Sequence, residues 1–198
     1  CLILSLGLHI ENGPLSLPLK DLSLLYEYWC FFALLRLAAE ETGQKIPFKE
    51  MIAVEQNSLR IHLQKGREQT IHFCLSDGRK LDIIYNPLFR GENYLVPQQP
   101  DIVLKLSDPK QQMSQFILDA KYRIDLSPEY IEQYGSAGPP EEALNVLYRY
   151  RDAIVDIDPD KGANLAPKRT VAHAIALFPY KETIPNSFRE CRLWLAIE

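Results

Sequence analysis

Two carboxylates and one lysine lie in two apolar runs whose composition and spacing could support phosphate chemistry. Residues 100–106 (PDIVLKL) contain Asp101, and residues 116–123 (FILDAKYR) contain Asp119 and Lys121. Mg²⁺ takes oxygen ligands, holding one or two protein carboxylates together with water and a substrate phosphate. The cation eases deprotonation of a bound water, and a lysine can orient that water or stabilise charge on the phosphate oxygens. The residues therefore predict in-line, metal-dependent hydrolysis of a phosphodiester.

Two strands must position these side chains. Alternate residues of a strand share a face, so Asp119 and Lys121 point the same way. An antiparallel hairpin that folds near Gln111 places Asp101 opposite Lys121, and the two aspartates become diagonal neighbours within about 5 to 8 Å. A slip of one residue would separate them. The alternative for Asp119 and Lys121 is a plain ion pair at an exposed sheet edge.

A third carboxylate, Glu27, lies within the apolar segment 24–32 (LLYEYWCFF). A buried carboxylate without a partner costs free energy. A metal site within reach would explain its presence. A salt bridge to a buried arginine, or a hydrogen bond from a tyrosine, would explain it equally well.

The wider pattern predicts an α/β fold in which helices flank a mixed sheet. A wide apolar arc predicts a buried helix over residues 20–42, with Asp21 as its N-cap and Gly43 as its stop. A second helix begins at Pro139-Pro140, buries Ala143, Leu147, Tyr150 and Ile154, and ends at Pro159 and Gly162. The sequence also predicts strands at 58–64, 70–75, 80–85, 170–178 (a central strand) and 191–197, a long loop at 86–100 and a polar loop at 124–138.

Bulk properties limit the alternatives. The chain has 198 residues, enough for one well-buried domain. Its net charge of −4 argues against a protein that coats nucleic acid by charge alone. No apolar run reaches the roughly 18 residues that span a bilayer, so we expect no membrane association. We expect residues 1–18 to be the edge of a longer protein or a linker, and residues 19–198 to form the functional domain.

The four cysteines form no Cys-x-x-Cys motif, and with the four histidines they complete no zinc pattern. Cys30 and Cys74 stand in apolar runs and are predicted to be small core residues. Reduced thiols of this kind are typical of a cytosolic protein.

The ordered set of Glu27, Pro100-Asp101 and Asp119-x-Lys121 resembles the PD-(D/E)XK nuclease superfamily, which has a restriction-endonuclease-like core. Three further segments are similar to its McrC-like branch, at residues 25–29 (LYEYW), 147–154 (LYRYRDAI) and 176–180 (ALFPY). In that branch, the nuclease subunit of a modified-DNA restriction system works with a GTP-driven AAA+ motor.

This resemblance implies roles for individual residues. Asp101 and Asp119 would be ligands of Mg²⁺ or Mn²⁺, with the Ala120 carbonyl as a third, and Glu27 would be an outer ligand or hold water. Lys121 would be the catalytic lysine. Arg149 and Arg151 would lie near the active face or the DNA backbone. Lys105 shares the face of Asp101 and could also touch DNA, although a solvated strand residue explains it as well.

We therefore predict a metal-dependent endonuclease domain that hydrolyses DNA, the cleavage module of a restriction or defence system in a prokaryotic cytoplasm. The expected partners are DNA and an AAA+ GTPase subunit, with a homodimer left open. One alternative is a non-catalytic scaffold or DNA clamp of the same fold. The other is a metal-dependent enzyme that acts on RNA.

Overall fold

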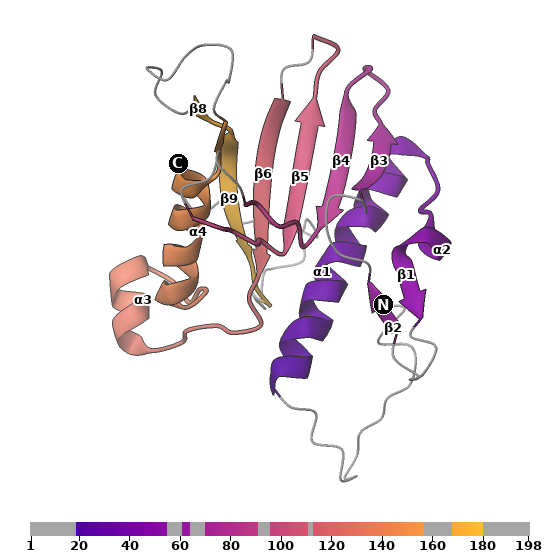
Figure 1. Ribbon diagram of the computed structural model, residues 1–198. Coiled ribbons are helices and arrows are strands. Elements are labelled where there is room, and N and C mark those ends of the chain that lie inside the picture. Colours follow the sequence, from indigo (N-terminus) through magenta and orange to yellow (C-terminus); the bar gives the residue numbers. More distant parts are fainter. Residues whose placement is uncertain are drawn as a thin grey trace, which may run out of the picture.

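A computed structural model describes residues 19–54, 61–63, 70–90, 96–110, 113–156 and 168–179 (Figure 1). Its helices are α1 (Leu19–Thr42), α2 (Phe48–Met51), α3 (Pro128–Tyr134) and α4 (Glu141–Ala153). Its strands are β1 (Ile52–Val54), β2 (Ile61–Leu63), β3 (Thr70–Cys74), β4 (Lys80–Tyr85), β5 (Ile102–Ser107), β6 (Met113–Ala120), β7 (Val155–Asp156), β8 (Lys168–Arg169) and β9 (Val171–Leu177).

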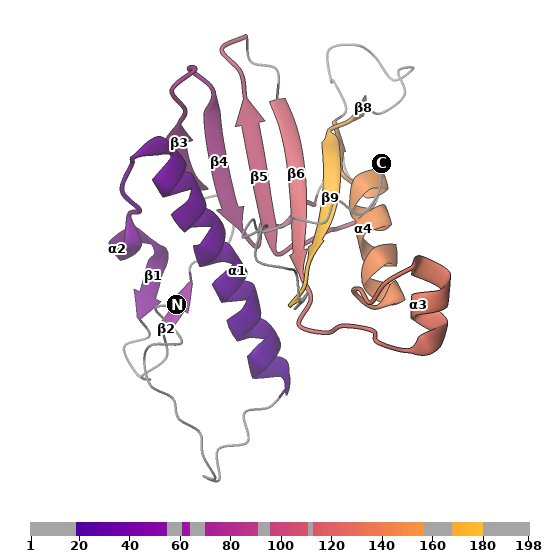
Figure 2. The same cartoon turned by 180° about the vertical axis from the view of Figure 1, so that it is seen from behind.

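A five-stranded sheet in the order β3-β4-β5-β6-β9 forms the centre of the molecule. Strands β3 to β6 make an antiparallel meander, and β9 joins β6 in parallel after the chain has passed through α3 and α4. Helix α1 lies across one face (Figure 2), and α4 packs on the other, against β9 and β6. The predicted α/β architecture with a mixed, helix-flanked sheet is confirmed.

The strand predicted at 170–178 is confirmed as β9, but the prediction that it stands at the centre of the sheet is wrong. In the described part of the chain it stands last in the sheet order. Its apolar composition has another cause, because both of its faces are covered. Ile175 joins the core beneath α1, whereas Ala174 and Ala176 join the core beneath α4.

Helix α1 forms over the predicted residues and ends at Thr42, where Gly43 takes a left-handed φ of +68°. The prediction that it is buried is wrong for most of its surface, since Leu25, Trp29 and Leu37 are exposed. The predicted N-cap is wrong, because the helix begins at Leu19 and therefore contains Asp21. One stripe of the helix is buried against the sheet, and it consists of Cys30, Phe31, Leu35 and Ala38.

The length and composition of α1 bear on the expectation of no membrane segment. Among the described residues, the span Leu22–Thr42 is long and apolar enough to cross a membrane by length and composition. That test is weak, since helices that cover a protein core also pass it. We interpret α1 as a core helix because its buried stripe packs on the sheet.

Helix α4 buries Ala143, Leu147 and Tyr150 as predicted, and Ile154 at its C-cap is 1% exposed. It ends at Ala153, before the predicted stops, because Ile154 is extended and Val155 pairs with Arg169 in β7–β8.

Other local predictions need correction, are met in part or lie outside the described residues. The polar loop at 124–138 contains α3, whose start is capped by Ser127 and whose end is set by Gly135 at φ +80°. Helix α2 and strand β1 were not predicted. Of the strand expected at 58–64, the structure describes Ile61–Leu63 as β2. The strand expected at 191–197 and the linker at 1–18 lie outside the described residues.

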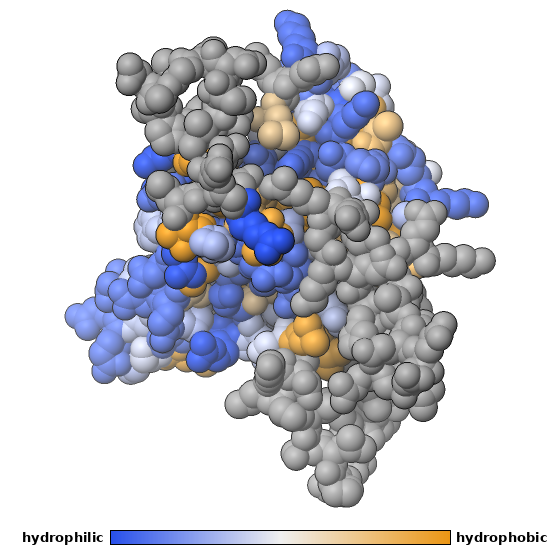
Figure 3. All heavy atoms as spheres, in the orientation of Figure 1, coloured by the Kyte–Doolittle hydropathy of each residue, from blue (hydrophilic) through white to orange (hydrophobic). Residues whose placement is uncertain are grey.

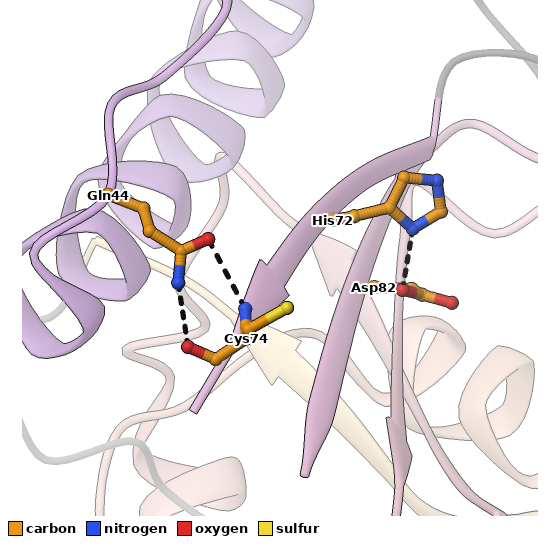
Figure 4. A network of polar contacts seen from close by, with 4 residues as sticks. All are labelled: Gln44, His72, Cys74 and Asp82. Carbon is orange, nitrogen blue, oxygen red and sulfur yellow. Dashed lines mark hydrogen bonds and ion pairs between the residues drawn. The ribbon is translucent and has the colours of Figure 1, made fainter. Parts of the chain in front are cut away.

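Strand β3 stands first in the order of the described sheet, next to the end of α1. The Gln44 amide donates to the Cys74 carbonyl at 2.6 Å and accepts from the Cys74 N–H at 3.3 Å (Figure 4). Beside this contact, His72 Nδ1 lies 2.8 Å from Asp82 Oδ1. Cys30 is buried as predicted, but Cys74 is exposed, because it faces away from the core beside the buried Phe73.

Candidate active site

The start of β5 and the end of β6 meet at one end of the sheet (Figure 1). Ile102 pairs with Leu118 and Val103 with Ile117, so the next step of this register sets Asp101 across from Asp119. The predicted register is wrong by two residues, since it set Asp101 opposite Lys121. Ser107 pairs with Met113, so the hairpin folds one residue earlier than expected, with a turn at Pro109 and Lys110. A shift of two residues preserves the face, and both aspartates therefore remain on the same side of the hairpin.

Asp101 is held at both its backbone and its side chain. Its carbonyl accepts from the Asn86 N–H at 2.7 Å, and its Oδ2 accepts from the Ala120 N–H at 2.7 Å. Asn86 itself takes a positive φ of 48° and accepts at Oδ1 from Gln99 Nε2 at 2.6 Å. The base of the long loop thus fixes the first aspartate against the end of β6.

Asp119 and Lys121 form an ion pair at the end of β6. Asp119 is 1% exposed, so this is not the exposed sheet-edge pair that was the alternative. The Lys121 N–H donates to the Leu177 carbonyl at 2.7 Å, which extends the pairing with β9 one residue beyond β6. This backbone contact sets where the lysine side chain leaves the sheet.

Glu27 approaches the same end of the sheet from α1. Its Oε1 accepts from the Tyr85 hydroxyl at 2.6 Å, which was one of the partners left open by the sequence. Its charge also contributes to raising the pKa of Asp101. The structure therefore brings Glu27, Asp101, Asp119 and Lys121 into one neighbourhood, reached from three elements that are distant in sequence.

The electrostatics of this neighbourhood favour a cation. Burial first, then the negative charges of Asp119 and Glu27, raise the pKa of Asp101 to about 8. The Ala120 N–H and Lys121 act in the opposite direction. Carboxylates that repel one another at partial burial are stabilised by a bound divalent ion.

We tested whether the residues present fit such an ion. Two aspartates match the one or two protein carboxylates that Mg²⁺ takes, with water and phosphate completing its octahedron. Among the residues that the structure describes, no group of three or more His, Cys, Asp or Glu side chains is arranged to hold a metal. The donor set therefore fits a sparsely liganded Mg²⁺ or Mn²⁺ and not a fully protein-enclosed metal.

Tyr150 is a member of this site that the sequence analysis treated as a packing residue. Its hydroxyl donates to the Gln99 carbonyl at 3.4 Å, at the end of the loop that leads into Asp101. Burial, followed by the charges of Asp119 and Asp101, raises the pKa of Tyr150, and a hydrogen bond to Asp119 contributes. A tyrosine on a buried helix stripe needs a partner for its hydroxyl, and this requirement was the signal available in the sequence.

The three cationic residues predicted to contact nucleic acid come from α4 and β5. Arg149 is exposed on α4 and close enough to Tyr150 to act on its pKa. Arg151 lies 5.5 Å from the Tyr148 ring centroid and 3.8 Å from Asp152, and so is engaged along its own helix.

Lys105 lies on β5, four residues beyond Asp101 and on the same face. It is paired in the sheet register with Asp82 on one side and Gln115 on the other. The surface over β3, β4 and β5 is largely hydrophilic (Figure 3). Lys105 is partly buried within this polar region.

The fold and the site together define a nuclease-type α/β domain, in which strand ends carry acidic residues and a lysine. A model of the PD-(D/E)XK nuclease superfamily matches residues 24–183. The chain belongs to that superfamily. No curated protein and no solved structure matches it.

Proposed function

We propose that this domain is a metal-dependent endonuclease that hydrolyses DNA phosphodiester bonds. The observation that carries the proposal is the convergence of Asp101, Asp119 and Lys121 at one end of the sheet, in a chain of a nuclease superfamily. We further propose an McrC-like role as the cleavage module of a prokaryotic, cytoplasmic restriction or defence system. In that role an AAA+ GTPase would be its partner, and a homodimer could pair two cuts.

In this proposal the acidic residues divide between two tasks. Asp101 and Asp119 would hold Mg²⁺ or Mn²⁺, and the Ala120 carbonyl, between Asp119 and Lys121, would be a third ligand. Glu27, fixed by Tyr85, would hold water at the outer side of the site. When bound, the cation supplies Lewis acidity to the attacked phosphate and eases deprotonation of water.

Lys121 would orient the attacking water and stabilise negative charge that develops on the phosphate oxygens. Its ion pair with the buried Asp119 keeps the ammonium group at the strand end before substrate arrives. Arg149, exposed on α4, would contact the DNA backbone, with Lys105 and Arg151 as weaker candidates.

The test is cleavage of supercoiled plasmid in Mg²⁺ or Mn²⁺, with a single-stranded RNA of matched length digested in parallel. Asp119→Asn and Lys121→Ala should each reduce the rate by roughly 100-fold or more, because each removes a preorganised electrostatic contact. Lys80→Ala is the control, since Lys80 is an exposed strand lysine at the far end of β4.

Melting curves of all variants should show that they fold. Equal cutting by wild type and Asp119→Asn would overturn this assignment of the site. A folded wild type that binds DNA without cutting it would favour the scaffold or clamp alternative, and preferential cutting of RNA would favour the other rival.

A further inference from the structure

Three aromatic side chains meet beside the end of β6, and we refer to Tyr26, Trp29 and Tyr122 as the aromatic group. The rings of Tyr26 and Trp29 are stacked, with centroids 5.8 Å apart and planes 17° apart. The rings of Tyr26 and Tyr122 lie 5.6 Å apart at 54°. Tyr26 is partly buried at the middle of the group, and the two flanking rings are open to solvent.

The exposure of these flanking rings is unusual for large aromatic residues. Trp29 is 45% exposed and Tyr122 is 41% exposed. Leu25, one helical turn before Trp29, is also 45% exposed. An apolar patch of this kind on a protein surface indicates a contact with another molecule.

The aromatic group adjoins the candidate active site in the chain. Tyr26 directly precedes Glu27, and Tyr122 directly follows Lys121. The first half of α1, which carries Tyr26 and Trp29, extends past the end of the sheet where β5 begins and β6 ends (Figures 1 and 2). Tyr122 packs on Tyr26 and therefore lies on the α1 side of the sheet. Tyr26 hydrogen-bonds to Cys30. Burial, and then the charges of Asp101 and Glu27, raise the pKa of Cys30, so the rings lie near Asp101. A substrate strand that passes Asp101 on the α1 side would meet these rings.

The charges beside the rings match a phosphate backbone. Cationic and aromatic side chains alternate along the chain after β6, in the order Lys121, Tyr122 and the exposed Arg123. Surfaces that bind single strands combine basic side chains along the backbone with aromatic rings on which bases stack. Lys121 is paired with Asp119, whereas Arg123 is exposed beside Tyr122. An exposed cation next to exposed rings matches a phosphate backbone better than a purely apolar protein segment, so these groups favour nucleic acid as the occupant.

We propose that the aromatic group stacks on an unpaired base beside the scissile phosphate. The inference rests on the proposed nuclease function and adds a substrate class to it. A base inside a duplex already has neighbours on both faces, so only an unpaired base can offer a face to Trp29 or Tyr122. The preferred substrate is therefore single-stranded or locally opened DNA.

Binding is measured in Ca²⁺, which accepts the same oxygen ligands as Mg²⁺, in a Trp194→Phe background that leaves Trp29 as the sole tryptophan. The probes are a single-stranded 12-mer, the same strand with abasic sites, and its duplex. We expect the intact strand to quench Trp29 fluorescence more strongly than the abasic strand or the duplex does.

Substitutions then separate stacking from simple apolar contact. Trp29→Leu should weaken binding of the intact single strand by about 10-fold, the size expected for one lost base–aromatic stack. Trp29→Phe should retain most of the affinity, and Tyr122→Leu should repeat the loss. Tyr148→Leu is the matched control, because Tyr148 is similarly exposed at 43% but lies on α4, on the other side of the sheet.

Two results would overturn the stacking role. One is unchanged affinity in both Trp29→Leu and Tyr122→Leu, and the other is an equal loss for the intact and the abasic strands. If cleavage that depends on Asp119 persists in those variants, the nuclease function stands without the stacking role. If stacking-dependent binding is found but no cleavage, the catalytic proposal fails and the aromatic group remains a DNA-binding surface.

Discussion

Burial and the neighbouring negative charges of the candidate site raise the pKa of Asp101. Its carboxyl lies beside the buried Asp119 and within the influence of Glu27, and its pKa rises from 3.8 to about 8. Between those two pH values, the folded protein holds a proton that the unfolded chain has released. The free energy of unfolding that this group contributes therefore falls as the pH rises from about 4 to about 8.

Replacing Asp101 by asparagine should consequently stabilise the metal-free protein at alkaline pH. Asparagine can still accept the Ala120 N–H, but it carries no charge to repel Asp119. In chelator at pH 8, we expect the free energy of unfolding of Asp101→Asn to exceed that of wild type by about 2 kcal/mol. Its melting temperature should be roughly 5 °C higher. At pH 5 the difference should fall to about a quarter of that value, because the pH is then only about one unit above the pKa of Asp101 in the unfolded chain. Thermal unfolding at both pH values measures this.

The exposed Glu41→Gln at the end of α1 serves as the control for removal of one negative charge. A stabilisation of Asp101→Asn that stays constant from pH 5 to pH 8 would contradict the pKa argument. It would mean that the substitution acts through packing and not through charge.

At the scale of helices and strands, apolar periodicity predicted α1, α4, β4 and the two strands that bear the aspartates. Those patterns reflect burial, which the chain encodes locally. The exact register did not follow, because it depends on the residue about which the hairpin folds, and moving that point by one residue changes the pairing by two. The place of β9 as the last of the described strands depends on which strand it joins, and no local pattern reports that.

The candidate site shows the same division. The types and order of Asp101, Asp119 and Lys121 could be predicted, because the chemistry limits which residues serve. Tyr85 and Tyr150 could not, because their roles arise from hydroxyl contacts across 58 residues to Glu27 and 51 residues to Gln99. Such partners become visible only when the elements are placed in space.

The edge strand β3 depends on a contact with the end of α1 that can be tested. The Gln44 amide satisfies both backbone groups of Cys74, which would otherwise face water at a sheet edge (Figure 4). We expect Gln44→Ala to lower stability by about 1 kcal/mol, or roughly 3 °C, and to increase light scattering on heating. The neighbouring exposed Lys45→Ala should do neither. Equal melting and scattering for the two variants would show that the amide contact does not protect the edge.

On the scale of the whole molecule, the candidate site draws residues from both faces of the sheet and from the strands between them. Glu27 comes from α1 on one face, Tyr150 from α4 on the other, and the aspartates from the two strands between them. A cation bound to Asp101 and Asp119 would thus join segments on both sides of the sheet. Its binding free energy should stabilise the folded molecule as a unit, because the unfolded chain has no such arrangement.

Mg²⁺ should therefore raise the melting temperature of the entire domain in a single transition. At a concentration 100 times the dissociation constant, the gain is about 2.7 kcal/mol, or roughly 5 to 10 °C. The effect should grow with the logarithm of the Mg²⁺ concentration and disappear in Asp119→Asn, while an equal ionic strength of NaCl should not reproduce it. A calorimetric scan measures both the shift and the number of transitions. The same Mg²⁺ shift in wild type and Asp119→Asn would place the cation elsewhere, and a second transition would show that the faces of the sheet do not unfold together.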